Sequence, residues 1–247
     1  MATTKAKHGR AYLMTSRALG VQEASGLAPV GDGSFLVVDD EHGIFRCSPD
    51  GASVQLDAGK GLADLEGIVV TPDGRHAYVV SERDGSIWRF VVEGDGLGAG
   101  ERLGQLPQLS KKRNQGWEGV AFAPAGTLSE QMTLVAAHQV KPRRIGLFDP
   151  ETLELHMLLK LPKAARKTIG ELNDIAIDAD GRILLLSGKS GYIAEMYLGG
   201  ESLSLARVYS IKTDSDDVPE GISIDAAGRV WICTDGKGML RELKLEP

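Results

Sequence analysis

The chain alternates short apolar runs with polar turns, and the pattern is clearest over residues 65–90, LEGIVVTPDGRHAYVVSERDGSIWRF. An acidic residue is followed there by three apolar runs of strand length, and both turns between the runs contain Asp-Gly. Asp-Gly between apolar runs favours a β-hairpin, because glycine accepts the positive φ that tight hairpin turns require. The stretch therefore predicts three consecutive antiparallel strands.

The same order of features recurs along the chain. Related stretches are WEGVAFAP (117–124), LNDIAIDADGRILLLSG (172–188), PEGISIDAAGRVWICTDG (219–236) and, more weakly, SGLAPVGDGSFLVVDD (25–40). A repeat of about 40 to 50 residues with several strands in each unit is typical of the blades of a β-propeller. The sequence therefore predicts an all-β, five-bladed propeller, with six blades as the alternative if residues 97–117 or 156–171 contain a degenerate blade.

The last repeat is one strand short. It supplies three apolar runs before Pro247, whereas residues 11–19, AYLMTSRAL, precede the first repeat and belong to no other blade. We expect residues 11–19 to pair with residues 239–245 as the outer strand of the last blade, which closes the ring and covers sheet edges. Residues 1–247 then form a single domain, with residues 1–10 as a flexible tail and a helical excursion between blades at residues 161–172.

Composition excludes several classes of protein. The formal net charge of -6 argues against a nucleic-acid binder. The chain has no apolar run long enough to span a membrane, and its basic N-terminus lacks the apolar stretch of a signal peptide. We therefore expect a cytoplasmic protein, or a periplasmic one if an export signal has been removed. Cys47 and Cys233 lie in apolar runs and are expected to be buried thiols in a reducing compartment rather than a disulfide.

Glutamate stands at the start of the first strand in three repeats. In a propeller these strands line the central axis, so their first residues converge on one mouth. The residues at this place are Ser25, Glu66, Glu118, Asn173 with Asp174, and Glu220. Converging carboxylates raise one another's pKa unless a cation lies between them, and carboxylate and amide oxygens are the ligands that calcium prefers.

The sequence therefore predicts a divalent-cation site, with calcium as the expected ion, and a water-filled channel as the alternative. Its predicted ligands are Glu66, Glu118, Asn173, Asp174 and Glu220.

The second strand of each blade ends at the same mouth, because strands alternate in direction. This places at the rim a set of polar residues: Asp39, Asp40, Glu82, Arg83, His138, Lys189 and Asp235. His138 is the first candidate for a general base, because imidazole titrates near neutral pH. Glu118 is the second catalytic candidate. The alternative is that His138 is an ordinary polar residue of a loop.

Two loops on this face are basic, SKKRNQG (110–116) and PKAARK (162–167). The candidate ligand-binding residues are Arg83, Lys111, Lys112, Arg113, Lys189 and Asp235. A basic rim over a cation-loaded acidic centre suits a small anionic molecule, whose phosphate or carboxylate would bridge to the metal. This ligand is the expected partner, with a protein partner as the alternative and neither nucleic acid nor a membrane expected.

The segments LEGIVVTPDGRHAYVVSERDGSIWRF, GWEGVAFAP and VPEGISIDAAGRVWICTDG resemble the SdiA-regulated family of bacterial propellers. That family is similar to the esterase-like phytase domain and, more remotely, to calcium-dependent gluconolactonases of the SMP-30 type. The gluconolactonase analogy implies a divalent ion held by a strand-start Glu and by Asn or Asp from other blades. Glu66, Glu118, Asn173 and Glu220 stand at comparable positions, although the gluconolactonases mix Glu, Asn and Asp and have six blades.

Three functions are consistent with these features. The first is a metal-dependent hydrolase of a small anionic ester, lactone or phosphodiester, in which the metal polarises the substrate oxygen or activates water. The second is a non-catalytic module that binds a ligand, with calcium as a structural ion or with a water-filled channel. The third is a platform that binds a protein partner through its loops, which the fold alone does not exclude.

Overall fold

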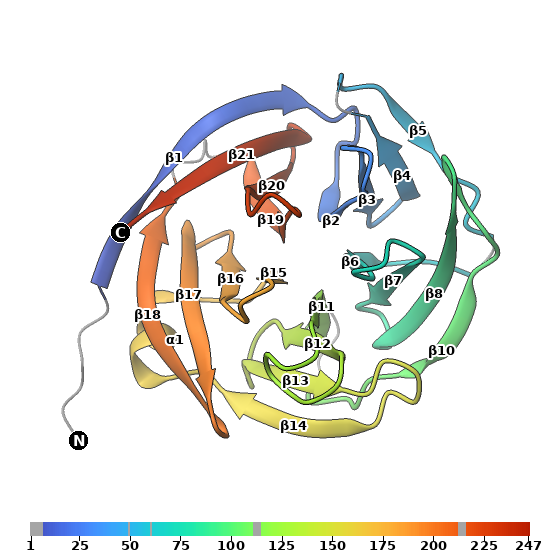
Figure 1. Cartoon of the computed structure of the whole chain (residues 1–247). Coiled ribbons are helices and arrows are strands. Elements are labelled where there is room, and N and C mark those ends of the chain that lie inside the picture. The colour runs from blue at the N-terminus through green and yellow to red at the C-terminus, as the bar shows by residue number, and fades with distance from the viewer. Residues whose placement is uncertain (1–6, 49, 60, 111–114, 212–215) are drawn as a thin grey trace.

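The computed structural model describes residues 7–48, 50–59, 61–110, 115–211 and 216–247. These residues form an all-β, propeller-like ring of sheets around a central axis, as the repeats predict (Figure 1). The first three sheets follow the chain and each begins with a strand at the axis. They contain β2 (Ala24–Pro29), β3 (Phe35–Asp39), β4 (Gly43–Cys47) and β5 (Ser53–Gln55); β6 (Leu65–Val70), β7 (His76–Ser81), β8 (Ser86–Glu93), β9 (Gly96–Leu97) and β10 (Glu101–Gln105); and β11 (Trp117–Ala123), β12 (Thr133–His138), β13 (Arg144–Phe148) and β14 (Leu155–Lys160).

The remaining strands form one eight-stranded sheet that consists of two halves joined by the N-terminal strand. Its order is β15 (Asp174–Ile177), β16 (Ile183–Ser187), β17 (Tyr192–Gly199), β18 (Ser202–Ser210), β1 (Lys7–Ala18), β21 (Met239–Glu246), β20 (Val230–Asp235) and β19 (Val218–Ile224). The short helix α1 (Lys163–Thr168) lies between β14 and β15, within the predicted helical excursion. It is not long or apolar enough to cross a membrane, and the described residues contain no other helix.

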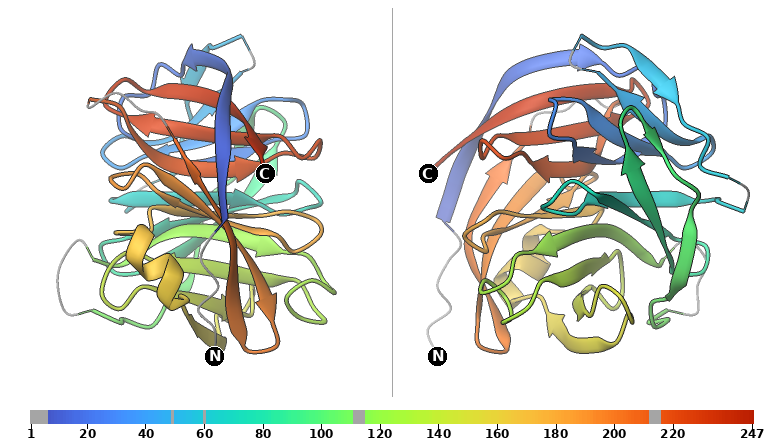
Figure 2. Two further views of the ribbon diagram at one scale, coloured as in Figure 1. Left: turned by 90° about the vertical axis from the view of Figure 1, so that its left-hand side faces the viewer. Right: turned by 45° about the vertical axis from the view of Figure 1, so that its right-hand side comes forward.

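The pairing of the N-terminal strand with the last strand is confirmed. β1 runs antiparallel to β21, from Ala11 opposite Leu245 to Ala18 opposite Met239. Figure 2 shows β1 on the outside of the ring, beside β21 and β18. The N-terminal strand β1 thus covers the edge of β21, which would otherwise be an exposed sheet edge.

The prediction of a flexible tail over residues 1–10 is wrong for residues 7–10. These residues pair in parallel with β18, with Lys7 opposite Arg207 and Arg10 opposite Ser210. Their side chains are mostly exposed, so their basic composition gives no sign of burial, yet backbone pairing does not depend on apolar side chains. Residues 1–6 lie outside the described residues.

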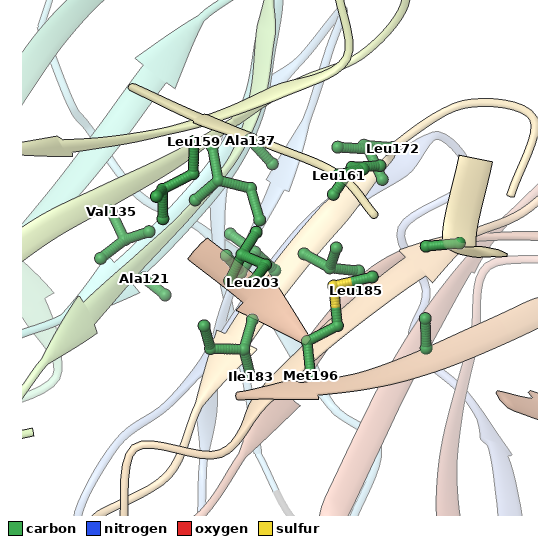
Figure 3. Packing of buried hydrophobic residues seen from close by; sticks show 14 of the residues in the cluster. Ala121, Val135, Ala137, Leu159, Leu161, Leu172, Ile183, Leu185, Met196 and Leu203 are labelled. Carbon is green, nitrogen blue, oxygen red and sulfur yellow. The ribbon is translucent and has the colours of Figure 1, made fainter. Parts of the chain in front are cut away.

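The apolar core lies between neighbouring sheets. In one cluster, shown in Figure 3, Val135 of the third sheet packs with Ile183, Leu185 and Met196 of β16 and β17. Burying such side chains contributes about 1.5–3 kcal/mol each relative to leaving them in water. Cys47 and Cys233 are both buried free thiols, as expected for thiols in apolar runs.

The five strands at the axis touch one another in a closed cycle, β2–β6–β11–β15–β19–β2. Glycine follows the strand-start residue in four of them: Gly26, Gly67, Gly119 and Gly221. A Cβ on Gly26 would lie 2.5 Å from the carbonyl oxygen of Glu66, and one on Gly67 would overlap the carbonyl oxygen of Glu118. The axis is therefore so narrow at this level that the strands meet backbone to backbone.

We expect Gly67→Ala to destabilise the fold by about 2 kcal/mol, because the added methyl group forces two inner strands apart. Urea unfolding of the purified variant measures this change. Gly31→Ala is the matched control, since a Cβ there would meet nothing within 4 Å. Equal stability of the two variants would contradict the close contact at the axis.

Candidate functional site

The residues at the strand starts meet in a central cavity of about 250 Å³. The cavity lies at the mouth of the ring, above the layer of glycines. Its lining consists of Glu23, Ser25, Asp40, Glu66, Glu82, Glu118, Gln139, Glu171, Asn173, Lys189, Glu220 and Asp235. The structure therefore brings together Ser25, Glu66, Glu118, Asn173 and Glu220, which lie far apart in the sequence.

Burial raises the pKa values of the three central glutamates, Glu66, Glu118 and Glu220. Glu118 has only 5% of its surface exposed, and this burial, with the neighbouring Glu66 and Glu82, raises its pKa well above the usual range. Burial, with Glu82 next in importance, raises the pKa of Glu66 to about 9. Burial and the nearby Glu171 and Asp235 raise the pKa of Glu220 to about 8. Ionisation of all three groups would place mutually repelling carboxylates in a setting that water stabilises poorly, so the protonated form is favoured.

The lining of the cavity is rich in carboxyl groups. It contains eight carboxylate side chains and one ammonium group, that of Lys189. The Nζ of Lys189 lies 3.5 Å from Glu171 Oε2. Asn173 donates from Nδ2 to Glu220 Oε2, and its Oδ1 accepts the backbone N–H of Gly188 at 2.7 Å. Positive charge in this cavity would relieve the repulsion.

The donor set fits a hard cation, although its oxygens are not gathered around one point. Oxygen ligands on flexible glutamates suit calcium, which takes six to eight oxygens in variable geometry. Glu66, Glu118 and Glu220 do not form a triad with all ligand oxygens within 4.8 Å, so rotation of their side chains is needed to reach one ion. Among the described residues, such a triad is formed at the rim by Glu23, Asp39 and Asp40.

The rim triad is partly committed to other contacts. Asp39 Oδ1 accepts the backbone N–H groups of Glu41 and His42, at 3.1 and 2.8 Å, and contacts His42 Nδ1 at 2.8 Å. The Glu23 side chain is half-buried, and the pKa of its carboxyl is raised mainly by Asp40. Asp39 is buried and Glu23 and Asp40 are half-buried, so part of the ligand capacity of the triad is already used by backbone and imidazole groups.

Asp174 does not line the cavity, which corrects its place among the predicted metal ligands. It is 2% exposed, and both carboxylate oxygens accept backbone N–H groups: Oδ1 from Ile175 at 2.8 Å and Oδ2 from Ile222 at 2.7 Å. Asp174 occupies the position that is glycine in the other repeats, and its side chain therefore lies in the layer beneath the mouth.

A second cavity of about 480 Å³, here called the side cavity, lies between β6–β8 and the strands that follow. Its lining consists of Asp64, Glu82, Arg83, Asp84, Gly85, Leu106, Gln108, Leu109, Ser110, Gln115, Gly116, Trp117 and His138. Glu82 lines both cavities, is 8% exposed, and accepts the backbone N–H of Gly116 at 2.9 Å. The two cavities therefore adjoin at a buried carboxylate.

His138 belongs to the side cavity, whereas Glu118 belongs to the central one, so the two catalytic candidates do not share a cavity. The His138 ring is almost fully buried, lies edge-on to Trp117, and contacts the Val140 carbonyl through Nδ1 at 3.0 Å. Burial lowers the pKa of His138, which keeps the imidazole neutral at pH 7.

The predicted ligand-binding residues are divided between the cavities. Arg83 lines the side cavity, with Nε 3.9 Å from Asp64 Oδ2, whereas Lys189 and Asp235 line the central cavity. Lys111, Lys112 and Arg113 lie outside the described residues. Arg83 and Lys189 thus each stand beside a carboxylate, that of Asp64 and that of Glu171, respectively.

Sequence reasoning did not assign Glu23, Glu171 or Gln139 to the site, and it named Glu82 only as a rim residue. Glu23 and Glu171 stand two residues before Ser25 and Asn173, respectively. Residues two apart share one face of an extended strand, so this spacing was the available signal. Glu82 and Gln139 follow the ends of β7 and β12, where the turn conformation decides which cavity a side chain reaches.

Comparisons with known proteins agree with the resemblance in the strand starts. The sequence model of the SdiA-regulated family matches residues 16–236. A search of curated proteins finds no match. Similar solved structures include a glutaminyl cyclase of Myxococcus xanthus, which is 15% identical with a TM-score of 0.70 over 98% of this chain and 99% of that one.

Two further solved structures share the architecture. A PQQ-bound aldose sugar dehydrogenase of Streptomyces coelicolor is 16% identical, with a TM-score of 0.61 over 98% of this chain and 100% of that one. A gluconolactonase of Xanthomonas campestris is 17% identical, with a TM-score of 0.57 over 90% and 72% of the two chains. At these identities the likeness is one of fold alone. The family match covers most of the sequence, and the chain belongs to the SdiA-regulated family.

Proposed function

We propose that the central cavity binds a divalent cation, calcium, through Glu66, Glu118, Asn173 and Glu220. The observation that carries this proposal is the convergence of three carboxyl groups from three separate strands on one cavity, with Glu118 buried, Glu66 and Glu220 half-buried, and all three pKa values raised. A bound cation offsets both the repulsion and the loss of hydration. We further propose that the ring has five blades, which begin at β2, β6, β11, β15 and β19, and that β1 is the outer strand of the fifth blade.

We also propose that a small molecule binds across the two cavities and is hydrolysed there, with an ester, lactone or phosphodiester as the reacting group. A bound divalent cation would supply polarisation of the substrate oxygen or an activated water. Glu82 lies between the cavities, and burial raises the pKa of its carboxyl, which suits a general base. The neutral His138 is the second base, within the side cavity.

The alternative is a non-catalytic module in which the cation is structural. One observation favours it: the cations described around the cavities, Lys189 and Arg83, already lie beside Glu171 and Asp64. A substrate anion would then have to bind mainly through the metal. The experiments below separate the two functions.

Calcium is expected to stabilise the chelator-treated protein against heat. At a free concentration of about 100 times Kd, binding adds about 2.7 kcal/mol to the free energy of unfolding. Glu118→Gln removes a charged ligand and should lose most of this gain, whereas the exposed Glu130→Gln is the control and should keep it. A wild-type melting temperature that does not respond to calcium, magnesium or manganese would contradict cation binding.

Turnover is tested with a panel of aryl esters, lactones and aryl phosphodiesters, each assayed with and without calcium or manganese. We expect metal-dependent hydrolysis of one class, reduced about 100-fold or more in Glu82→Gln, as for the loss of a general base. His138→Ala shows whether the imidazole contributes. Cation binding without turnover on any substrate would assign the chain to the non-catalytic alternative.

A further inference from the structure

Directly beneath the central cavity, four of the five inner strands have a glycine, and the fifth has a residue with a side chain. Gly26, Gly67, Gly119 and Gly221 hold the equivalent positions, and β15 has Asp174 instead. The neighbouring strands leave no space for a side chain at the glycines: a Cβ on Gly221 would lie 2.9 Å from the Cα of Gly26. Among these five positions, Asp174 is therefore the one whose side chain must fit between the neighbouring strands.

The carboxylate of Asp174 crosses from its own strand to both neighbours. Its Oδ2 accepts the N–H of Ile222 in β19 at 2.7 Å, and its Oδ1 accepts the N–H of Ile175 at 2.8 Å. On the β11 side, a Cβ on Gly119 would lie 2.6 Å from Oδ1, so the carboxylate is in close contact with that strand. One buried side chain therefore ties β11, β15 and β19 together at the axis.

These three strands carry three of the four residues proposed to hold the cation. Glu118 precedes Gly119 in β11, Asn173 precedes Asp174, and Glu220 stands two residues before Ile222 in β19. The side chains of Asn173 and Glu220 are also hydrogen-bonded to each other. Any change in the separation of the strands at Asp174 is passed directly to the ligands one or two residues away.

We propose that Asp174 is a positioning residue that sets the spacing of Glu118, Asn173 and Glu220, and through it the size of the cation that the central cavity selects. This inference rests on the proposed cation site. Calcium binds oxygen ligands at about 2.3–2.6 Å in variable geometry, whereas magnesium demands an octahedron at about 2.0–2.1 Å, so ligand spacing discriminates between them. Groups that orient the ligands of a metal typically contribute about 10- to 100-fold to its affinity.

The test is calorimetric titration of calcium and magnesium into chelator-treated wild type and Asp174→Gly. Glycine is the residue that four of the five inner strands have at this place, so the backbone accommodates it and only the bridging carboxylate is lost. Asp174→Asn is a second variant that keeps the volume but replaces one accepting oxygen with a donor. Val208→Ala, a buried truncation on the outer strand β18, is the control for a general loss of stability.

We expect both Asp174 variants to bind calcium at least about tenfold more weakly than the control and to lose part of the preference for calcium over magnesium. Amide exchange of Ile222, whose N–H donates to Asp174, should become faster in the metal-free variants than in Val208→Ala. Affinities within twofold of the control, with unchanged selectivity, would overturn the positioning role and leave the cation site intact. A wild type that binds neither ion would instead reject the proposed function on which the inference rests.

Discussion

A chain that lacks residues 7–18 is expected to lose the cooperative unfolding transition of the whole domain. The deletion removes the strand that pairs with β21 from Arg10 to Ala18 and with β18 from Lys7 to Arg10. It also separates the two halves of the eight-stranded sheet, because β1 joins them. Since a domain is stable by only about 5–15 kcal/mol in total, loss of a central strand of a sheet affects the entire fold.

Thermal melting followed by circular dichroism measures this effect. Leu13→Lys is the control within the same strand, because its side chain is 57% exposed and its backbone pairing is kept. Such an exposed substitution should change the free energy of unfolding by no more than about 0.5 kcal/mol. A truncated chain that melts cooperatively at the temperature of the full chain would refute the role of β1 in closing the ring.

Calcium affinity is expected to rise at least about 100-fold per pH unit between pH 6 and pH 7. The pKa of Glu66 is raised to about 9 and that of Glu220 to about 8, so both carboxyl groups hold a proton at pH 7 in the metal-free protein. A cation must displace these two protons, and each displaced proton contributes about a factor of ten per pH unit. The rise should flatten as the pH passes 8 and then 9.

Titrations over this pH range, in two buffers with different heats of ionisation, count the protons directly. We expect the release of at least about two protons per calcium ion at pH 7, because the pKa of Glu118 is raised as well. An affinity that stays constant from pH 6 to pH 8 would contradict the involvement of Glu66 and Glu220.

The raised pKa values of Glu66 and Glu220 also make the stability of the metal-free protein depend on pH. Above the ordinary glutamate pKa of 4.5, the unfolded chain has lost protons that folded Glu66 and Glu220 still hold, up to pH values of about 9 and 8. The folded state then binds more protons than the unfolded state, so the free energy of unfolding falls as the pH rises from 4.5 toward 8 or 9. Calcium should remove most of this dependence.

Most features of the architecture could be predicted because each of them has a local signal in the sequence. Asp-Gly pairs mark the turns: Gly74 and Gly85 adopt the positive φ values, 73° and 71°, that those turns require. The missing strand of the last repeat and the unassigned residues 11–19 together indicate the closure. The parallel pairing of residues 7–10 with β18 had no such signal, because it depends on backbone hydrogen bonds of residues whose side chains are mostly exposed.

Of the candidate site, the sequence could predict only the residues that occupy the same place in each repeat. Glu66, Glu118, Asn173 and Glu220 share one place in the repeat, so they meet in one cavity. His138 and Asp174 differ from this expectation for a three-dimensional reason. His138 is the last residue of β12, whose end faces the side cavity, and Asp174 stands at the glycine level of the axis, where its carboxylate accepts the N–H groups of Ile175 and Ile222.

A crystal structure of the manganese- or calcium-loaded protein with anomalous diffraction data would show whether a divalent cation binds at the axis. We expect one strong anomalous peak in the central cavity, within coordination distance of oxygens from Glu66, Glu118, Asn173 and Glu220. An axis that contains only water, or an ion held solely by Glu23, Asp39 and Asp40 at the rim, would contradict it.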